Sequence, residues 1–133
     1  MNQEELKTRL LSDLLQLNLP VNEVDLFIRP FSKTYYGRYF PIIEDGKRLR
    51  PKIYIYPYEN TEGDLMSYDV IMDTVIHEFC HHIQYTSGSF VRHKGVMHNT
   101  QFWKLYNHYM KRAEKYKIIK IIEKKGECNN ESE

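Results

Sequence analysis

The chain has 133 residues and a formal net charge of +1, with 41% hydrophobic and 28% charged residues. This length fits one domain with a core of its own, and the composition is that of a soluble globular protein rather than a disordered chain. The chain has only two cysteines, Cys80 and Cys128, which excludes a disulfide framework and a cysteine-rich zinc ribbon within the chain.

The first half of the chain predicts one helix followed by strands. Leucines recur at helical spacing over residues 3–17, and apolar and polar residues alternate over residues 24–29. Aromatic and β-branched residues dominate residues 35–43, and residues 48–56 supply a returning strand. Asp45 with the glycine after it is a strong hairpin signal between them. We therefore expect an amino-terminal helix and about three short antiparallel strands.

The second half predicts two longer helices. Ser67 is a typical amino-terminal cap for a helix over about residues 69–85, and a second long helix begins at about Asn99. Residues 126–133 are polar, and we expect them to be disordered. The chain is thus predicted to be a small α+β protein, with a single domain over residues 1–125.

The motif with the clearest chemistry is His-Glu-x-x-His, at His77, Glu78 and His81. Residues four apart lie on one face of a helix, so the two imidazoles can point to one metal ion. Glu78 lies about 100° around the helix from His77. It is close enough to act as general base on a metal-bound water without being a ligand.

The alternative is an amphipathic helix whose histidines are solvated. The apolar residues around the motif make the helix too hydrophobic for a surface element, so the motif should be buried or line a cleft. A buried charge without a partner is unfavourable, and a metal ion supplies a partner. The apolar residues are Val70, Ile71, Val75, Ile76, Phe79, Cys80 and Ile83.

A catalytic zinc usually has a third protein ligand beside its water. The longer pattern with a third histidine six residues after the second is absent, because Ser87 occupies that position. The ligand must therefore come from elsewhere in the chain. The candidates are His82, His93, His98, His108 and Glu114.

These candidates differ in how easily they reach the motif. His82 is five positions after His77, which turns it away from the other two ligands. His93 lies in a predicted loop, and His108 would need the second long helix to present its middle to the metal. His98 directly precedes that helix, and an aromatic pair one turn later can anchor its backbone. We favour His98, while Glu114 remains an alternative.

The motif and its distal histidine together resemble the SprT-like zinc metallopeptidases. The resemblance rests on residues 73–81 (DTVIHEFCH) and 97–103 (MHNTQFW), and extends over about residues 50–110. It implies a small zincin fold, with a sheet of a few strands beside the metal helix and a third histidine ligand at the head of a later helix. The resemblance implies that the zinc ligands are His77, His81 and His98, and that Glu78 is the catalytic glutamate.

Two departures from the family pattern affect what can be carried over. Asn99 stands where many members have glycine, and asparagine also tolerates unusual backbone angles, so the change is mild. The cysteine-rich zinc ribbon of several members is missing, and any role that depends on it does not transfer.

The resemblance implies hydrolysis of peptide bonds in a protein or peptide substrate. Zinc would lower the pKa of its water to about 7, and Glu78 would accept the proton and deliver it to the leaving amine. Tyr85, His93 and Tyr106 are candidate donors to the developing oxyanion. An exposed sheet edge could bind the substrate as an added strand.

Basic residues gather in two segments, with a net charge of +5 over residues 29–52 and +6 over residues 101–125. A solvated lysine face explains them, and contact with DNA is the functional alternative, since the related family includes peptidases that act on proteins attached to DNA.

Two other functions stay open. One is a regulatory zincin of a mobile element or phage that cleaves a repressor, with a third ligand such as Glu114. The other is a non-catalytic, zinc-stabilised domain that binds nucleic acid. A purely structural zinc would not need Glu78, which argues against the second.

The location of the protein is expected from what the sequence lacks. Residues 1–5 have no basic segment followed by an apolar run, and no stretch approaches the roughly 18 apolar residues of a membrane span. The low cysteine content is typical of a reducing compartment. We therefore expect a cytoplasmic protein with no membrane partner.

Overall fold

The computed structural model describes residues 1–41, 50–87 and 98–120. Its elements are, in chain order, α1 (Gln3–Gln16), the 3-10 helix η1 (Val21–Glu23), β1 (Asp25–Ile28), β2 (Gly37–Phe40), β3 (Lys52–Ile55), α2 (Tyr68–Thr86) and α3 (Thr100–Lys115). The expected turn at Asp45, the loop that contains His93 and the polar tail at 126–133 lie outside the described residues.

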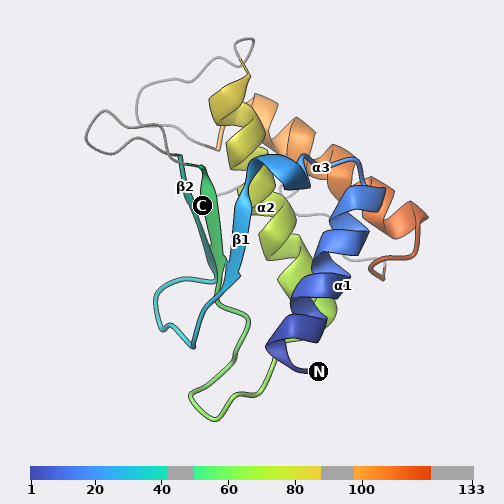
Figure 1. Ribbon diagram of the computed structural model, residues 1–133. Helices are drawn as coiled ribbons and strands as arrows, with labels where there is room; N and C mark the ends of the chain where they lie inside the picture. Colours follow the sequence, from blue (N-terminus) through green and yellow to red (C-terminus); the bar gives the residue numbers. More distant parts are fainter. Residues whose placement is uncertain (42–49, 88–97, 121–133) are drawn as a thin grey trace.

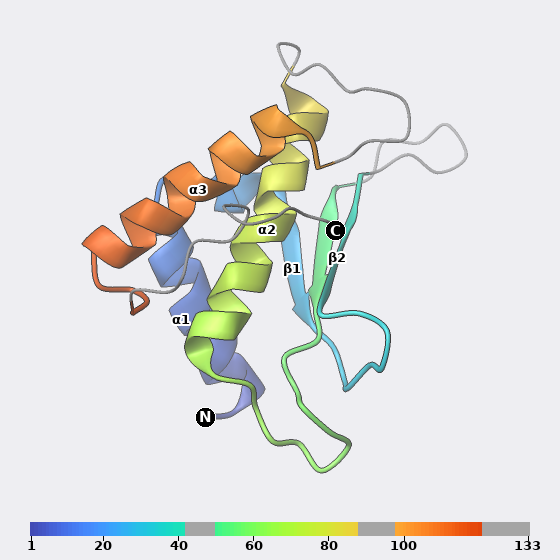
Figure 2. The ribbon, with the colours of Figure 1, turned by 180° about the vertical axis from the view of Figure 1, so that it is seen from behind.

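The protein is an α+β structure in which the helices lie on one face of a three-stranded sheet (Figures 1 and 2). Both views place α2 between the sheet and α3, with α1 alongside α2. The three α-helices and the three strands were expected from the sequence, and their presence confirms the predicted α+β class. Within the described residues, no helix combines the length and the apolarity that crossing a membrane requires.

The amino-terminal helix is explained by its cap and its leucines. Asn2 and Glu5 form a reciprocal capping box, in which each side chain accepts a hydrogen bond from the other's backbone N–H. Leu6, Leu10 and Leu14 lie on one face and are buried. Removing these leucines from water is the main stabilising term for the helix, since short helices are marginal alone.

The prediction of an antiparallel sheet is wrong, because the sheet is mixed. Its strand order is β1-β3-β2, with β3 antiparallel to β2 and parallel to β1. Alternating side chains define which face of a strand is buried but not the direction of its neighbour. The chain places β2 at the far edge before it returns along β3 through the centre, so consecutive strands β1 and β2 are not neighbours.

The core lies between the sheet and the helices. Ile53 and Ile55 of the central strand are at most 1% exposed, and they face α2 together with Leu26 of β1. The opposite face of the sheet carries aromatic rings, among which Tyr54 contacts Phe27 at 5.7 Å between ring centroids. In β1 and β3 the sheet therefore presents aliphatic side chains to α2 and aromatic rings to the other side.

Candidate metal centre

Helix α2 carries the motif on a buried framework. The Ser67 side chain accepts a hydrogen bond from the Val70 N–H at 3.3 Å, and Asp69 places a negative charge in the first turn, where the helix dipole favours it. Six apolar residues of the helix are buried and hold its orientation between the sheet and α3. They are Ile71, Met72, Val75, Ile76, Phe79 and Cys80.

Helix α3 begins at Thr100, directly after its cap Asn99, and His98 is the residue before that cap. The Asn99 side chain accepts a hydrogen bond from the Phe102 N–H at 2.9 Å, and the Trp103 N–H donates to the Asn99 carbonyl at 3.1 Å. Phe102 is fully buried, so the first turn of α3 is held in the core. His98 directly precedes this cap, and its backbone position follows from the packing of the next turn.

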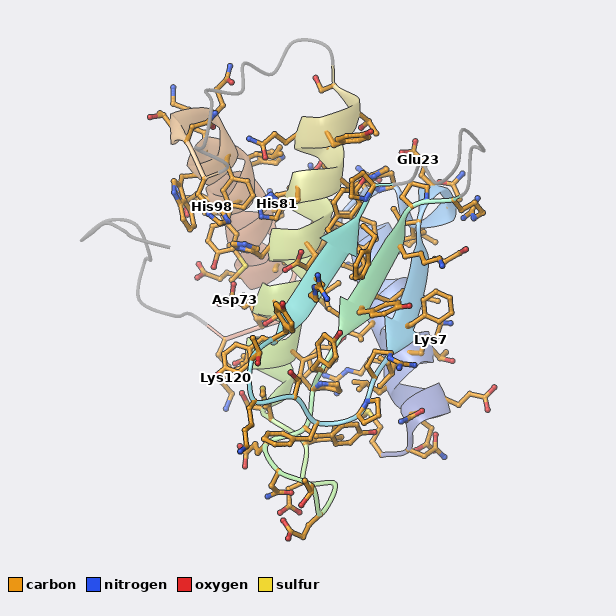
Figure 3. All side chains as sticks on the ribbon, turned by 90° about the vertical axis from the view of Figure 1, so that its left-hand side faces the viewer. Lys7, Glu23, Asp73, His81, His98 and Lys120 are labelled. Carbon is orange, nitrogen blue, oxygen red and sulfur yellow. The ribbon has the colours of Figure 1, made fainter. Side chains whose placement is uncertain are left out.

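The three predicted histidines converge on one point. The His98 Nε2 atom lies 3.0 Å from His81 Nε2 and 3.1 Å from His77 Nε2. One nitrogen from each ring lies within 4.8 Å of the other two, so the three histidines could hold a metal ion. Figure 3 shows His81 and His98 pointing toward each other from α2 and α3.

Hydrogen bonds alone do not explain this convergence well. A ring nitrogen either carries a proton and donates or presents a lone pair and accepts. The single Nε2 of His98 therefore cannot donate to His77 and accept from His81 at the same time. A metal ion accepts one lone pair from each ring, which accounts for all three nitrogens together.

The aromatic ring of Phe102 packs against all three imidazoles. The Phe102 ring is stacked on His81, with 4.6 Å between centroids, and lies 5.0 Å from His77 and 4.8 Å from His98. Trp103 lies 5.7 Å from His98 on the same turn. The first turn of α3 thus comes directly after His98 and Asn99 in the chain, and it also packs against His77 and His81 of α2.

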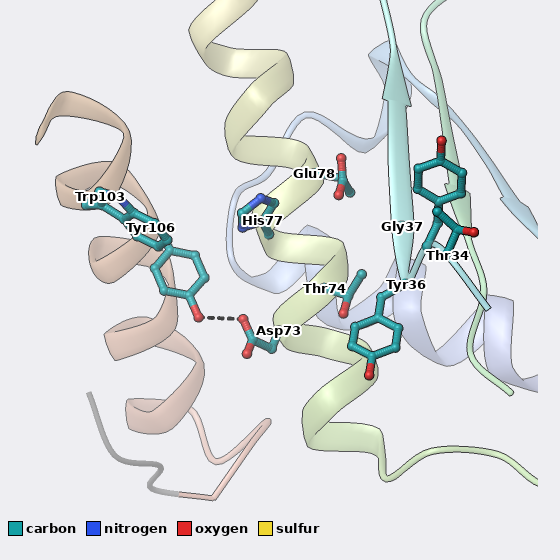
Figure 4. Close-up of a pocket in the computed structure, with 10 residues that line it drawn as sticks. Thr34, Tyr36, Gly37, Asp73, Thr74, His77, Glu78, Trp103 and Tyr106 are labelled. Carbon is teal, nitrogen blue, oxygen red and sulfur yellow. Dashed lines mark hydrogen bonds between the residues drawn. The ribbon is translucent and has the colours of Figure 1, made fainter. Parts of the chain in front are cut away.

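Glu78 lies on an adjacent side of α2 and points toward β2. Figure 4 shows His77 turned to α3 and Glu78 turned to the strand, from neighbouring positions on the helix. Glu78 is 8% exposed. Burial raises the pKa of its carboxyl to about 7, and the charge of Arg38 opposes that rise.

Two hollows flank Glu78, each with a volume of about 370 Å³. The first extends from Glu78 past His77 to α3, and the second extends past His81 toward the end of α2. Both are lined by Gly37 as well as Glu78, so they meet at the start of β2. The lining residues of the first are Thr34, Tyr35, Tyr36, Gly37, Asp73, Thr74, His77, Glu78, Trp103 and Tyr106.

His82 is not part of the cluster of three histidines, and it bonds to β2 and η1 instead. It is 1% exposed, its Nε2 donates to Glu23 Oε1 at 2.8 Å, and its Nδ1 accepts from the Tyr39 hydroxyl at 2.7 Å. Burial, with smaller contributions from Tyr85 and Glu23, raises the pKa of Tyr39 and keeps that hydroxyl protonated. The three side chains connect η1, β2 and α2.

The remaining candidate ligands are separate from the cluster. His108 is exposed and lies 3.3 Å from Arg112. Glu114 is fourteen residues beyond the start of α3, which corresponds to about 21 Å along a helix. His93 lies outside the described residues. Neither His108 nor Glu114 belongs to the group of potential ligands that the structure brings together.

Sequence reasoning missed one partner that the helix period predicts. Asp73 is four residues before His77 and lies on the same face of α2, in the wall of the first hollow. The Tyr106 hydroxyl donates to Asp73 Oδ1 at 2.5 Å, across the α2–α3 interface (Figure 4). Burial, with the Asp73 charge and hydrogen bond, raises the Tyr106 pKa.

The expected oxyanion donors are placed at opposite ends of the site. The Tyr106 hydroxyl is hydrogen-bonded to Asp73, beside His77. Tyr85 is 44% exposed and lines the second hollow with His81. Because Tyr106 is 2% exposed and its hydroxyl donates its one proton to Asp73, Tyr85 is the better placed of the two to donate to a substrate.

The chain was compared with protein-family models, with curated proteins and with solved structures. No protein-family model, curated protein or solved structure matches the chain. The resemblance to the SprT-like peptidases therefore stays a prediction from the motifs, and the function is inferred from the site itself.

Proposed function

We propose that this protein is a zinc-dependent metallopeptidase of the SprT-like zincin type. The observation that carries the proposal is the convergence of the three Nε2 atoms of His77, His81 and His98, with the Glu78 carboxyl on the adjacent side of the same helix. Three protein ligands with an acidic neighbour form a set of groups that suits peptide hydrolysis by a zinc ion.

Zinc fits the donor set better than a harder cation. Imidazole nitrogens suit zinc and other late transition metals, whereas magnesium and calcium prefer oxygen ligands. A tetrahedral zinc ion with Zn–N distances of about 2.0–2.1 Å holds its nitrogens about 3.3–3.4 Å apart. The two observed separations of 3.0 and 3.1 Å are close to this value. Three protein ligands also leave the fourth position open, as in catalytic sites.

The chemistry would divide between the metal and Glu78. A zinc ion held here would supply a water of lowered pKa and polarise the scissile carbonyl. Glu78 would accept the proton of the attacking water and deliver it to the leaving amine. Its position next to a ligand, on the side that faces the hollows, lets it reach both water and substrate without binding the metal.

A protein or peptide substrate could bind along β2. This strand is at the edge of the sheet, and no other strand within the described residues pairs with its outer side. An unpaired edge can bind an extended peptide through backbone hydrogen bonds, largely independently of side chains. The two hollows on either side of Glu78 run beside this strand, so a peptide added there would pass the proposed catalytic centre.

Two alternatives are less well supported by the site. A regulatory, repressor-cleaving zincin with a glutamate as third ligand would need Glu114 near the motif, and α3 places it far along the helix. A non-catalytic zinc domain would have no use for a buried carboxyl beside its ligands, whereas Glu78 is held there at a desolvation cost.

Metal removal and reconstitution test the proposal. Purified protein should contain about one zinc per chain and should hydrolyse a labelled unfolded protein, because a site of three histidines leaves one position open. Chelation should abolish hydrolysis, and one equivalent of zinc should restore it while magnesium should not. Hydrolysis that survives complete removal of zinc would contradict the proposal, and so would zinc-loaded protein with no activity on any unfolded substrate.

A further inference from the structure

Gly37, the first residue of β2, lies against the side chain of Glu78. A Cβ atom added at Gly37 would lie 2.7 Å from Thr74 Cγ2, 3.1 Å from Glu78 Cγ and 3.2 Å from Glu78 Oε2. Real Cβ contacts are essentially never as short as the first distance and rarely as short as the other two. The strand backbone and the Glu78 carboxyl therefore occupy adjoining space that has no room for a methyl group.

The backbone conformation does not explain the glycine. Gly63 is the only glycine within the described residues that has a positive φ, so Gly37 has a conformation that other residues adopt. Glycine weakens a strand because it loses more backbone entropy on folding and has no side chain to pack. Because Gly37 has no Cβ, it leaves space that the side chains of Thr74 and Glu78 occupy.

The strand register shows why a side chain at this position would meet Glu78. Gly37 pairs with Ile55 and Tyr39 pairs with Ile53, and both isoleucines are buried against the helices. Tyr39 is two residues from Gly37 and reaches His82 on α2. Because side chains two apart share one face of a strand, a side chain at position 37 would also point at α2.

We propose that Gly37 is a positioning residue for the catalytic glutamate: its bare Cα leaves the space in which the Glu78 carboxyl is held, and any side chain there would displace that carboxyl from its place beside the histidines. This inference rests on the proposed peptidase function for its catalytic consequence. The contact between the two residues does not depend on that function.

A methyl group at this position could act in a second way, because Gly37 also lines both hollows. Obstruction of the groove would weaken substrate binding and raise KM. Displacement of the Glu78 carboxyl would leave binding almost unchanged and lower kcat, because general-base catalysis needs the base within hydrogen-bond reach. The two effects are therefore separable by kinetics.

The clash with Thr74 has to be removed before the contact with Glu78 can be measured. Thr74→Ser deletes Cγ2, the atom at 2.7 Å, and retains the hydroxyl that donates to the Val70 carbonyl at 3.1 Å. In a Thr74→Ser background, the nearest remaining contacts of the Gly37→Ala methyl group are the Glu78 atoms at 3.1 and 3.2 Å. Thr74→Ser alone is the matched reference, and the double variant is compared with it rather than with the parent.

The kinetic test compares these two variants with the zinc content of each measured. We expect Gly37→Ala/Thr74→Ser to have a kcat about 10- to 100-fold below that of Thr74→Ser, with KM changed by less than about twofold and zinc still bound at one per chain. An unchanged kcat, or a loss confined to KM, would overturn the proposal.

A stability cycle tests the contact without relying on activity. Glu78→Ala removes both Glu78 atoms that the new methyl group would meet. In the Thr74→Ser background, Gly37→Ala should therefore lower the melting temperature when Glu78 is present and should do so much less when it is alanine. Equal shifts in the two backgrounds would overturn the contact. If the parent itself lacks peptidase activity, the proposed function fails, and the catalytic role fails with it, while this cycle still decides the contact.

Discussion

At the scale of single residues, the proposed ligand His98 shows how a side chain can be held in place from outside a helix. It precedes the Asn99 cap, and its ring lies 4.8 Å from the buried Phe102 ring. The cap and that packing restrict the backbone and the imidazole before any metal binds. Such restriction raises metal affinity, because less conformational entropy is lost on binding.

Replacement of His98 by alanine should therefore remove most of the zinc affinity. We expect the dissociation constant for zinc, measured by competition with a chelating indicator, to rise at least about 100-fold, since losing a ligand should cost no less than losing its outer hydrogen-bond partner. Activity should be lost as well.

His82→Ala, His108→Ala and Glu114→Ala are the controls and should keep about one zinc per chain. His108 is the cleanest of these, because it is exposed and outside the cluster. Zinc binding by His98→Ala at the parent's affinity, together with its loss in Glu114→Ala, would show that the ligand set is wrong.

The sequence predicted these residues unequally, for a physical reason. His77, Glu78 and His81 are related by the helix period, which is local and can be followed without a fold. His98 is seventeen positions beyond His81, and it was identified only by the anchoring of its helix and by resemblance. Gly37 could not be found, because its role depends on the approach of β2 to α2.

At the scale of elements, a chain of hydrogen bonds through the buried His82 connects α2 to the sheet. His82 of α2 bonds to Tyr39 of β2 on one side and to Glu23 of η1 on the other. Buried polar groups with all partners present stabilise one arrangement of elements over others. This chain of bonds therefore helps to fix the distance between β2 and α2 on which the site depends.

Tyr39→Phe should destabilise the protein more than the loss of one surface hydroxyl. The buried Nδ1 of His82 would lose its donor, and an unsatisfied buried group costs about 1–3 kcal/mol. Tyr35→Phe is a suitable control, because the Tyr35 ring is 40% exposed and surface changes cost less than about 0.5 kcal/mol. Equal free energies of unfolding for the two variants would show that the hydrogen bond contributes nothing.

The elements themselves were predicted better than their arrangement. The Ser67 cap of α2 was found from residue type and position, because capping is a local interaction, and the start of α3 was predicted at about Asn99, which the structure shows to be its cap. The parallel pairing of β1 with β3 was missed. Strand alternation carries no direction, and only the core formed by Ile53 and Ile55 places β3 between the other two strands.

At the scale of the whole molecule, the basic residues have three kinds of environment. Arg50 donates to Asp25 Oδ1 at 3.0 Å and to the Asn22 carbonyl at 2.9 Å, so it is already engaged. Lys111 and Lys115 of α3 are exposed. On the outer face of the sheet, arginines stack on aromatic rings at centroid distances of 4.4–5.2 Å. These pairs are Arg38 on Tyr35 and Phe40, and Arg29 on Tyr54.

We propose weak, salt-sensitive binding to DNA without sequence preference, to which the exposed lysines of α3 contribute. Lys111→Gln should reduce the dependence of log affinity on log salt by about 0.7–0.9, the value for one phosphate contact. Lys7→Gln is a charge-matched control on α1, away from α3 (Figure 3). Titration of labelled single- and double-stranded oligonucleotides at two salt concentrations measures both. No binding at low salt would show that these lysines are only solvated surface residues and do not bind DNA.

The central claim for the whole molecule is that Glu78 acts as general base beside a zinc ion bound by three histidines. Glu78→Gln changes one carboxylate oxygen to an amide nitrogen and leaves the ligands and the core contacts in place. Zinc content, melting temperature and turnover of an unfolded protein should be measured together on this variant and on the parent.

We expect Glu78→Gln to keep about one zinc per chain and a parent-like fold, with turnover lower by about 10²–10⁴-fold, the usual contribution of a general base. Turnover equal to that of the parent in a zinc-loaded, folded variant would contradict the proposed mechanism.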